Sequence, residues 1–525
     1  MEHPLVIGAL LRTGLRVAPS QGITYRDQVE MTYAEFGDRV HRLGAALTAL
    51  GLGVGAVVAV MEHDSHRYLE CFFAIPMLGA TLHTVNVRLP PEQVLYTINH
   101  AEDDAILVHA DFLPLLLPLL PRMRPVRLIL LSDKAQALPD GFAGEYEELL
   151  AEGDAGFAFP EFGETTRATL FYTTGTTGDP KGVTYSHRQL VLHTLGVIAA
   201  LAPIPGRGGI KADDVYMPLS PLFHVHGWGF PFIVTMLGMR QVYPGRYEPG
   251  KILALIAKHD VTLSHCVPTV MAMVLGAAGD ADLSRWKVIV GGSALPEGMA
   301  RAALARGIDV HAGYGMSETG PILTIADMAA TQQGGDTVGI RVATGKAAPL
   351  VQVRVVDPAM RDVPSDGVSV GEVVARAPWL TDGYLRDAAG TEALWRGGWM
   401  HTGDVGNLSA DGTLRITDRL KDVIKSGGEW ISSLELESII SAVPGVVEVA
   451  VVGMPDAQWG ERPVVLVVAK IPVEAAVHAA VGHAIAAGRL SKWAAPDRVV
   501  TVDAIPKTSV GKLDKKAIRA GLAQL

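Results

Sequence analysis

Short runs of apolar and β-branched residues recur along the chain up to about residue 340, and stretches with helical spacing of apolar positions follow them. Gly, Pro or Ser residues stand at the ends of most runs. Strands buried on both faces of a parallel sheet have uninterrupted apolar runs of this kind. The pattern therefore predicts an α/β fold with mostly parallel, buried strands. The predicted strands cover residues 56–60, 105–108, 127–131, 261–266, 287–290 and 308–311.

Beyond about residue 340 the pattern changes to short strands separated by turns. The polar segment 418–422 then precedes a new apolar run. A chain of 525 residues is too long for one hydrophobic core. We therefore predict a large N-terminal domain, residues 1–418, with a β-rich part at its end, and a small α/β domain, residues 419–525. The strands expected in the β-rich part cover residues 351–356, 371–377 and 413–417.

Composition narrows the class of protein. Apolar residues make up 49% of the chain and Gly is abundant, which fits a globular enzyme, and the net charge of −10 argues against a nucleic-acid partner. The two cysteines, Cys71 and Cys266, are too few for a disulfide framework or a zinc site. The most apolar stretch, 112–120, is short and contains two prolines, so we expect no membrane span. No basic leader follows Met1, and a cytoplasmic protein is expected.

The segment 171–183 holds the densest group of candidate functional residues, Phe-Tyr-Thr-Thr-Gly-Thr-Thr-Gly-Asp-Pro-Lys-Gly-Val. Small residues let backbone N–H groups converge on an anion, the hydroxyls add donors, and Lys181 adds a positive charge. These groups suit a polyphosphate. The segment is not a P-loop, because Gly182 rather than Ser or Thr follows the lysine. The alternative is a polar surface turn.

Two further segments follow predicted strands. Gly291-Gly292 comes directly after residues 287–290, and the Gly-rich segment 313–320 follows 308–311. Within it, an aromatic ring at Tyr314 can stack on a purine, and a carboxylate at Glu318 can hold Mg²⁺. Residues 315–319 nearly match the Gly-x-Ser-x-Gly motif of serine hydrolases, but the last position is Thr, which excludes that class.

Other candidates carry weaker signals by themselves. Asp404 is expected in a tight loop, where its carboxylate could accept hydrogen bonds from a ribose diol; an ordinary turn aspartate is the alternative. His224 and His226 stand two residues apart, but no third ligand is evident nearby, so a metal site is not expected there.

Together these motifs resemble the adenylate-forming superfamily, which includes acyl-CoA synthetases. The segment 172–183 matches that family's phosphate-binding signature throughout, and 506–512 matches its terminal Pro-x-Thr-x-x-Gly-Lys. The sequence Gly-Gly-Glu-Trp at 427–430 is most similar to the corresponding segment of medium- and long-chain fatty-acyl-CoA ligases. The resemblance implies a large domain of two interleaved α/β lobes plus a β-rich part, and a small mobile C-terminal domain.

The resemblance also implies roles for individual residues. Mg²⁺ would be held by Thr173 and Glu318, and the ribose by Asp404 and Arg419. Lys512 would neutralise the transferring phosphate, and Lys421 would be the hinge between the domains. ATP or AMP would also be contacted by Thr173, Thr174, Gly175, Thr176, Thr177, Lys181, Gly313, Tyr314, Gly315, Met316, Ser317, Lys425 and Trp430.

In the same family a histidine borders the carboxylate being activated, which here is His224. The acyl pocket would be lined by His226, Gly227, Trp228, Gly291 and Gly292. The channel for the acyl acceptor would be lined by Lys425, Gly427 and Gly428.

The implied reaction has two steps: ATP activates an apolar, fatty-type carboxylic acid to acyl-AMP, and the acyl group then passes to CoA. An amine or a carrier-protein thiol is the alternative acceptor. Gln458 replaces a basic residue common in fatty-acyl ligases, which weakens the CoA reading slightly. A non-catalytic acyl-nucleotide binder is a third alternative, disfavoured because Lys181, Glu318, Asp404 and Lys512 are all present. A homodimer is an assembly that the sequence leaves open.

Overall fold

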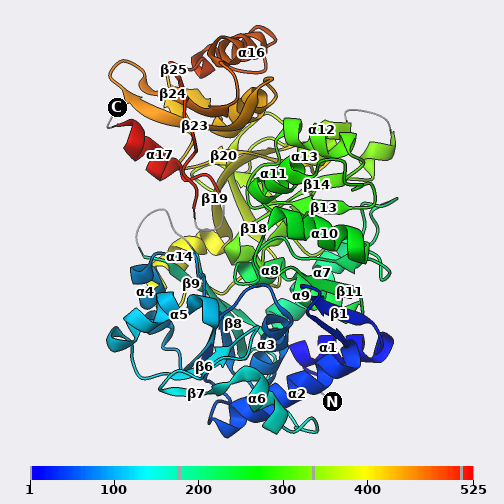
Figure 1. Cartoon of the computed structure of the whole chain (residues 1–525). Helices are drawn as coiled ribbons and strands as arrows, with labels where there is room; N and C mark the ends of the chain where they lie inside the picture. The colour runs from blue at the N-terminus through cyan, green and yellow to red at the C-terminus, as the bar shows by residue number, and fades with distance from the viewer. Residues whose placement is uncertain (1–2, 174–178, 334–336, 428, 509–511, 524–525) are drawn as a thin grey trace.

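The structure is a computed structural model, and it describes residues 3–173, 179–333, 337–427, 429–508 and 512–523. The first α/β lobe lies at the bottom of the view in Figure 1, the second occupies its right-hand side, and the C-terminal strands and helices lie at the top. The expected α/β fold, with a small C-terminal α/β unit, is confirmed. Cys71 and Cys266 are both buried and unpaired.

The first lobe is built on a seven-stranded sheet in the order β7-β6-β5-β3-β4-β8-β9. All neighbours are parallel except β8 and β9, which form an antiparallel pair. Its helices include α2 (Tyr33–Ala49), α3 (His66–Met77), α4 (Pro91–Ala101), α5 (Leu113–Leu116) and α6 (Tyr146–Glu152). The strands are β3 (Val57–Met61), β4 (Thr81–Thr84), β5 (Ala105–His109), β6 (Arg127–Leu131), β7 (Phe142–Glu145), β8 (Arg167–Thr173) and β9 (Lys181–Ser186).

The second lobe contains a nine-stranded sheet in the order β16-β15-β14-β13-β12-β10-β11-β1-β2. The lobes are interleaved, because β1 and β2 from the start of the chain complete this second sheet. Its strands are β1 (Gly22–Tyr25), β2 (Val29–Thr32), β10 (Val215–Tyr216), β11 (Arg240–Tyr243), β12 (Leu263–Cys266), β13 (Lys287–Val290), β14 (Asp309–Gly315), β15 (Ile322–Ile325) and β16 (Lys346–Ala347).

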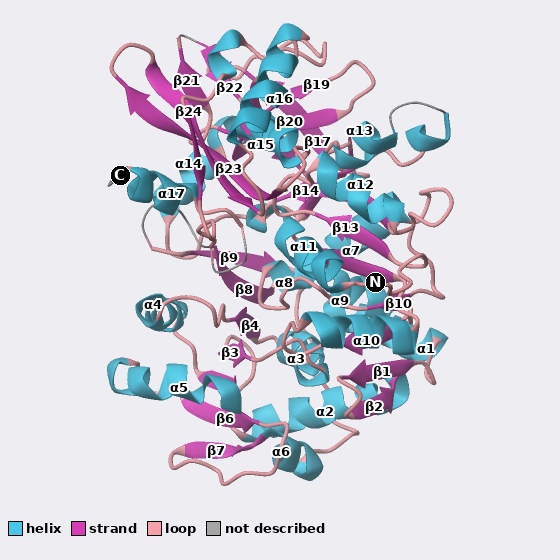
Figure 2. Cartoon of the chain, turned by 45° about the horizontal axis from the view of Figure 1, so that its top comes forward, coloured by secondary structure: helices cyan, strands magenta, loops and turns pink. Residues whose placement is uncertain are grey.

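Helices cover both sheets (Figure 2). Those of the second lobe and of the junction between the lobes are α1 (Ile7–Val17), α7 (His187–Leu201), α9 (Phe230–Met236), α10 (Pro249–His259), α11 (Pro268–Ala277), α12 (Glu297–Ala305) and α13 (Thr337–Val342). Helix α7 follows β9 without a loop, because Ser186 and Gln189 form a capping box that starts it. The β8–β9 hairpin is thereby joined directly to a helix of the core.

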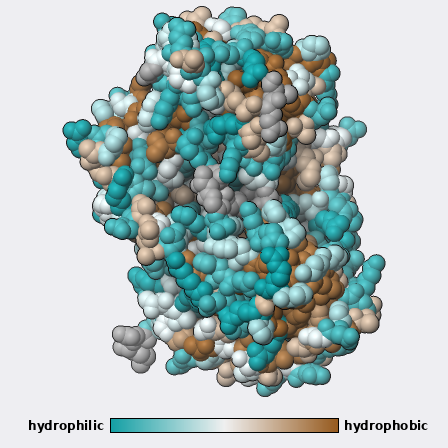
Figure 3. Space-filling model, turned by 90° about the vertical axis from the view of Figure 1, so that its left-hand side faces the viewer, coloured by the Kyte–Doolittle hydropathy of each residue, from teal (hydrophilic) through white to brown (hydrophobic). Residues whose placement is uncertain are grey.

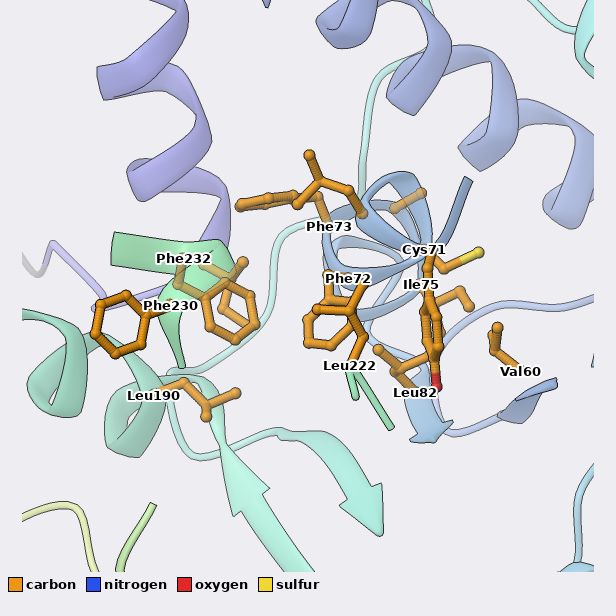
Figure 4. Close-up of a cluster of buried hydrophobic side chains, with 14 of the residues drawn as sticks. Val60, Cys71, Phe72, Phe73, Ile75, Leu82, Leu190, Leu222, Phe230 and Phe232 are labelled. Carbon is orange, nitrogen blue, oxygen red and sulfur yellow. The ribbon is translucent and has the colours of Figure 1, made fainter. Parts of the chain in front are cut away.

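Aromatic side chains join the two lobes. Phe72 of α3 lies 5.6 Å from Phe232 of α9 between ring centroids, and Phe73 lies at the same distance from that ring. Leu190 and Leu222 belong to the same buried cluster (Figure 4). Val225 and Trp228 belong to this core as well, so the segment that carries three of the predicted acyl-pocket residues is packed into it.

A four-stranded antiparallel sheet, in the order β17-β18-β19-β20, follows the lobes. After β20 ends at Arg419, the next strand, β21, belongs to the separate C-terminal sheet. The strands of the four-stranded sheet are β17 (Gln352–Val356), β18 (Gly371–Arg376), β19 (Met400–Leu408) and β20 (Leu414–Arg419). The strands of the C-terminal sheet are β21 (Ile424–Ser426), β22 (Glu429–Ile431), β23 (Val446–Asp456), β24 (Gly460–Ala469) and β25 (Arg498–Thr501). The helices are α14 (Ala388–Leu394), α15 (Ser433–Ser441), α16 (Glu474–Ala486) and α17 (Lys515–Leu522).

Two local expectations are corrected. Tyr314 lies within β14 rather than in a loop after it, because β14 pairs with β13 up to Ala312 and with β15 from Gly313 onward. Asp404 lies within β19 rather than in a tight loop, directly opposite Arg419 of β20. In both cases antiparallel pairing with the next strand of the chain extends the sheet through residues that look like a turn.

The molecular surface drawn in Figure 3 is mostly hydrophilic, with hydrophobic residues gathered in places. None of the helices among the described residues is both long enough and apolar enough to span a membrane.

Candidate active site

The β8–β9 hairpin positions the predicted phosphate-binding lysine. Thr173 at the end of β8 faces Lys181 at the start of β9. The residues between them that were predicted to bind phosphate, namely Thr174, Gly175, Thr176 and Thr177, lie outside the described residues. The Lys181 ammonium lies 4.4 Å from the centroid of the Tyr384 ring and 3.5 Å from Asp387 Oδ2. With 42% of its side chain exposed, Lys181 is accessible to a ligand.

Tyr384 links this lysine to the predicted magnesium ligand. Its hydroxyl donates a hydrogen bond to Glu318 Oε1 over 2.7 Å. Glu318 is buried, and this burial raises the pKa of its carboxyl group. A buried carboxylate within reach of a phosphate site suits Mg²⁺, whose charge would offset the cost of burial. Sequence motifs did not identify Tyr384, because it lies 66 positions from Glu318 and no recognisable spacing connects the two residues.

The predicted nucleoside-binding residues form a second group. The Tyr314 hydroxyl donates to Asp404 Oδ2 over 2.7 Å, and Arg419 Nε lies 3.2 Å from Asp404 Oδ1. Burial raises the pKa of Asp404, and the Arg419 charge opposes that shift. The three side chains come from β14, β19 and β20, so the predicted ring and ribose contacts are brought together by sheet pairing.

The rest of the β14 segment is held by backbone contacts. A side chain at Gly315 would overlap the carbonyl oxygen of Pro321, which makes glycine necessary there. Met316 donates its N–H to Thr319 Oγ1 over 2.9 Å, and the Ser317 carbonyl accepts a hydrogen bond from Tyr185 over 2.7 Å. Gly313 lies where β14 changes its pairing from β13 to β15.

Lys512 reaches from the C-terminal unit to the second lobe. Its Cε lies 3.3 Å from the place that a Cβ at Gly292 would occupy, so the glycine leaves room for the lysine chain. Burial lowers the pKa of Lys512 to about 8, helped by the positive charge of Arg419 and opposed by Asp404 and Glu318. The predicted phosphate-neutralising lysine thus lies within the electrostatic reach of both carboxylates.

The segment with His224 has an unusual backbone. From residue 225 to 229 every φ is positive, between 49° and 74°, so the turn labelled α8 in Figure 1 (Val225–Trp228) is left-handed. Such a turn costs roughly 1–2 kcal/mol for each residue with a side chain. The preceding residues are held by hydrogen bonds from Leu222 N–H to Asp64 and from the Thr84 hydroxyl to the Phe223 carbonyl.

The left-handed turn separates the predicted acyl-pocket residues. The Trp228 indole lies over Gly291, 3.1 Å from the place of a Cβ there, and close to Gly292. His226 lies instead against β8, where its Nε2 is 2.7 Å from the Thr169 hydroxyl. Gly227 faces Leu222. Trp228 and the glycine pair are therefore brought together, whereas the described contacts of His226 and Gly227 lie elsewhere.

His224 is uncharged at neutral pH. Burial lowers its pKa to about 3, and the positive charges of Lys512 and Arg88 act in the same direction. The side chain is therefore suited to donate or accept a hydrogen bond rather than to supply a charge.

The predicted acceptor-channel residues form a group on the C-terminal sheet. Lys425 Nζ lies 5.9 Å from the Trp430 ring centroid, and 48% of Trp430 is exposed. A Cβ at Gly427 would lie 2.6 Å from the Trp493 ring. Gly428 lies outside the described residues. Burial lowers the pKa of Lys421, the predicted hinge, which lies two residues after the end of β20.

One further group has ligand types suited to a metal. His63, His109 and Asp111 offer atoms within 4.8 Å of one another. Asp111 already contacts Arg246 and His63, and its N–H donates to His109 Nδ1. Hydrogen bonds thus account for this arrangement.

Comparisons with known proteins agree with the fold and the motifs. The model of the "AMP-binding enzyme" family matches residues 12–385, and that of the "AMP-binding enzyme C-terminal domain" matches residues 435–512. A long-chain-fatty-acid–CoA ligase of Thermus thermophilus is 39% identical, covering 93% of this chain and 89% of that protein.

A 3-methylmercaptopropionyl-CoA ligase of Ruegeria pomeroyi is 37% identical, covering 99% of this chain and 97% of that protein. The crystal structure of ATP-bound MatB from Rhodopseudomonas palustris aligns with a TM-score of 0.84 at 28% identity, covering 99% of each chain. The first family model extends over Lys181 and Glu318, and the second over Lys512. The chain therefore belongs to the AMP-binding enzyme family, the adenylate-forming superfamily that its motifs resemble.

Proposed function

We propose that the protein is an AMP-forming acyl-CoA ligase that activates an apolar carboxylic acid with ATP and transfers the acyl group to CoA. The observation that carries the proposal is the grouping of Lys181, Glu318, Asp404 and Lys512, which come from four separate segments. The Thermus thermophilus relative is a long-chain-fatty-acid–CoA ligase and the Ruegeria pomeroyi relative a 3-methylmercaptopropionyl-CoA ligase, which supports the same reaction.

In the first step the carboxylate oxygen of the acid bonds to the α-phosphorus of ATP. The bond from that phosphorus to the bridging oxygen breaks, and pyrophosphate leaves with the electron pair. Lys181 would bind the outgoing phosphates, and Lys512 would neutralise charge at the α-phosphate. His224 would hydrogen-bond the carboxylate. These residues act by positioning and charge neutralisation, and no side chain is a nucleophile.

Mg²⁺ would be held by Glu318 and Thr173, where it would supply neutralising charge for the phosphates. Asp404 and Arg419 would hold the ribose, and the Tyr314 ring would face the adenine. Tyr384 would orient Glu318 through its hydroxyl, because that hydrogen bond fixes one carboxylate oxygen.

In the second step the CoA sulfur, after losing its proton, attacks the acyl carbon, and AMP leaves. We propose that the C-terminal domain, residues 419–525, turns about Lys421 between the steps. Lys512 would then withdraw, and the face with Lys425 and Gly427 would border the acceptor channel. The same first step serves an amine or a carrier-protein thiol. We also propose that the protein forms a homodimer and is located in the cytoplasm.

Pyrophosphate release measured with a panel of carboxylic acids, in the presence and absence of CoA or amines, tests the function. We expect release with apolar acids and formation of the thioester only with CoA. Release without any acid dependence contradicts the adenylation step. If more amide than thioester formed, the acceptor would be an amine and the proposal of CoA as the acceptor would be wrong.

A further inference from the structure

A buried histidine stands beside the predicted acyl pocket and takes no part in the mechanism above. His265 is the third residue of β12 and is fully buried. Its ring centroid lies 4.9 Å from that of Trp228 and 4.6 Å from that of Phe230. Aromatic rings thus surround an imidazole, which has two nitrogen atoms that need hydrogen-bond partners.

Strand β12 connects both walls of that pocket. The His265 carbonyl accepts a hydrogen bond from Leu219 N–H, in the segment that leads to Trp228. The Cys266 carbonyl accepts one from Gly291 N–H. The two segments against which an acyl chain would lie are thus both bonded to the backbone of β12, and the His265 ring contacts Trp228 of the first.

Only one ring nitrogen of His265 has a partner. Nε2 lies 2.9 Å from the Tyr216 hydroxyl, whereas Nδ1 is buried and has no hydrogen-bond partner among the described residues. If the Tyr216 hydroxyl donates to Nε2, its proton is satisfied and the imidazole proton is on Nδ1. The other arrangement would leave both the phenol proton and the Nδ1 lone pair unpaired. Nδ1 is therefore assigned as the N–H nitrogen.

A buried N–H without an acceptor destabilises a protein unless a ligand satisfies it. We propose that His265 selects acids whose chain carries a hydrogen-bond acceptor, an ether or thioether, a few atoms from the carboxylate. The acceptor atom would take the hydrogen bond from Nδ1–H while the remaining carbons lie against Trp228. This inference rests on the proposed function and specifies its acid.

Three acids of equal chain length test it, because they differ in one atom: β-methoxypropanoate, β-methylthiopropanoate and pentanoate. The measured quantity is kcat/KM for pyrophosphate release, expressed as the ratio of each hetero acid to pentanoate. The ether oxygen is the stronger acceptor and the thioether sulfur the weaker. Because His265→Phe removes one hydrogen bond, it should lower the ratio of the ether acid to pentanoate about tenfold and the ratio of the thioether acid to pentanoate by less.

Two further variants keep the result interpretable. His265→Asn offers an amide N–H near the place of Nδ1 and should restore part of the ether ratio. The double variant His265→Phe with Tyr216→Phe leaves no phenol without a partner, so it should fold even if the single variant does not, and it should show the same low ratio.

Equal ratios in the wild type and in both Phe variants would overturn the inference while leaving the proposed function intact. A ratio that falls in His265→Phe but stays low in His265→Asn would also overturn it, because lost packing would then explain the change. If the wild type released no pyrophosphate with any acid, the proposed function itself would fail.

Discussion

Replacement of Lys512 by alanine should slow the formation of acyl-AMP without slowing the transfer of the acyl group to CoA. The pKa of this lysine falls from 10.5 to about 8, and one pKa unit corresponds to about 1.4 kcal/mol. Keeping the ammonium charged at this buried position therefore costs about 3 kcal/mol relative to water. The negative phosphates of ATP would offset that cost on binding. Removing the charge should cost adenylation roughly 10²–10³ in rate, the usual effect of losing one preorganised group.

Two assays on Lys512→Ala check this expectation. Acid-dependent pyrophosphate release should fall by that factor, whereas conversion of supplied acyl-AMP and CoA to thioester should stay near the wild-type rate. The melting temperature should not fall, because a poorly solvated charge has been removed.

Lys507→Ala is the matched control. Lys507 belongs to the same segment, but its ammonium pairs with Glu448 over 2.6 Å. Both half-reactions should be unaffected in this variant. Equal losses of both half-reactions in Lys512→Ala, or a comparable loss in Lys507→Ala, would refute the role given to Lys512.

Three further predictions concern the same site. Because Lys512 loses its charge as the pH rises through about 8, kcat/KM for ATP should fall about tenfold per pH unit above that value; a flat profile up to pH 10 would contradict it. Lys421→Pro should restrict the backbone rotation that the proposed hinge needs, so acyl-AMP should accumulate in single-turnover experiments; a full reaction at wild-type speed argues against the hinge. Trp228→Ala should favour longer acids, by up to about 0.8 kcal/mol for each methylene newly buried; a lower melting temperature with an unchanged chain-length profile would instead make Trp228 a core residue.

The sequence alone determined the α/β class and the family, because both depend on local pattern. Apolar runs predicted the buried strands β6 and β13 at the bounds that the structure has. The phosphate motif predicted that Thr173 and Lys181 belong together, and they face each other across one hairpin. Residues a few positions apart are held together by the chain itself, so their spacing is informative.

Tertiary structure alone decided which distant side chains meet. Tyr384 contacts both Glu318 and Lys181 through packing between remote segments. The left-handed turn sends His226 and Trp228 to different neighbours, although they are two residues apart. His265 had no signal in the sequence, because an unpartnered nitrogen is a property of everything packed around it. Motifs record which groups are available, whereas burial and hydrogen bonding depend on segments that come together only when the chain folds.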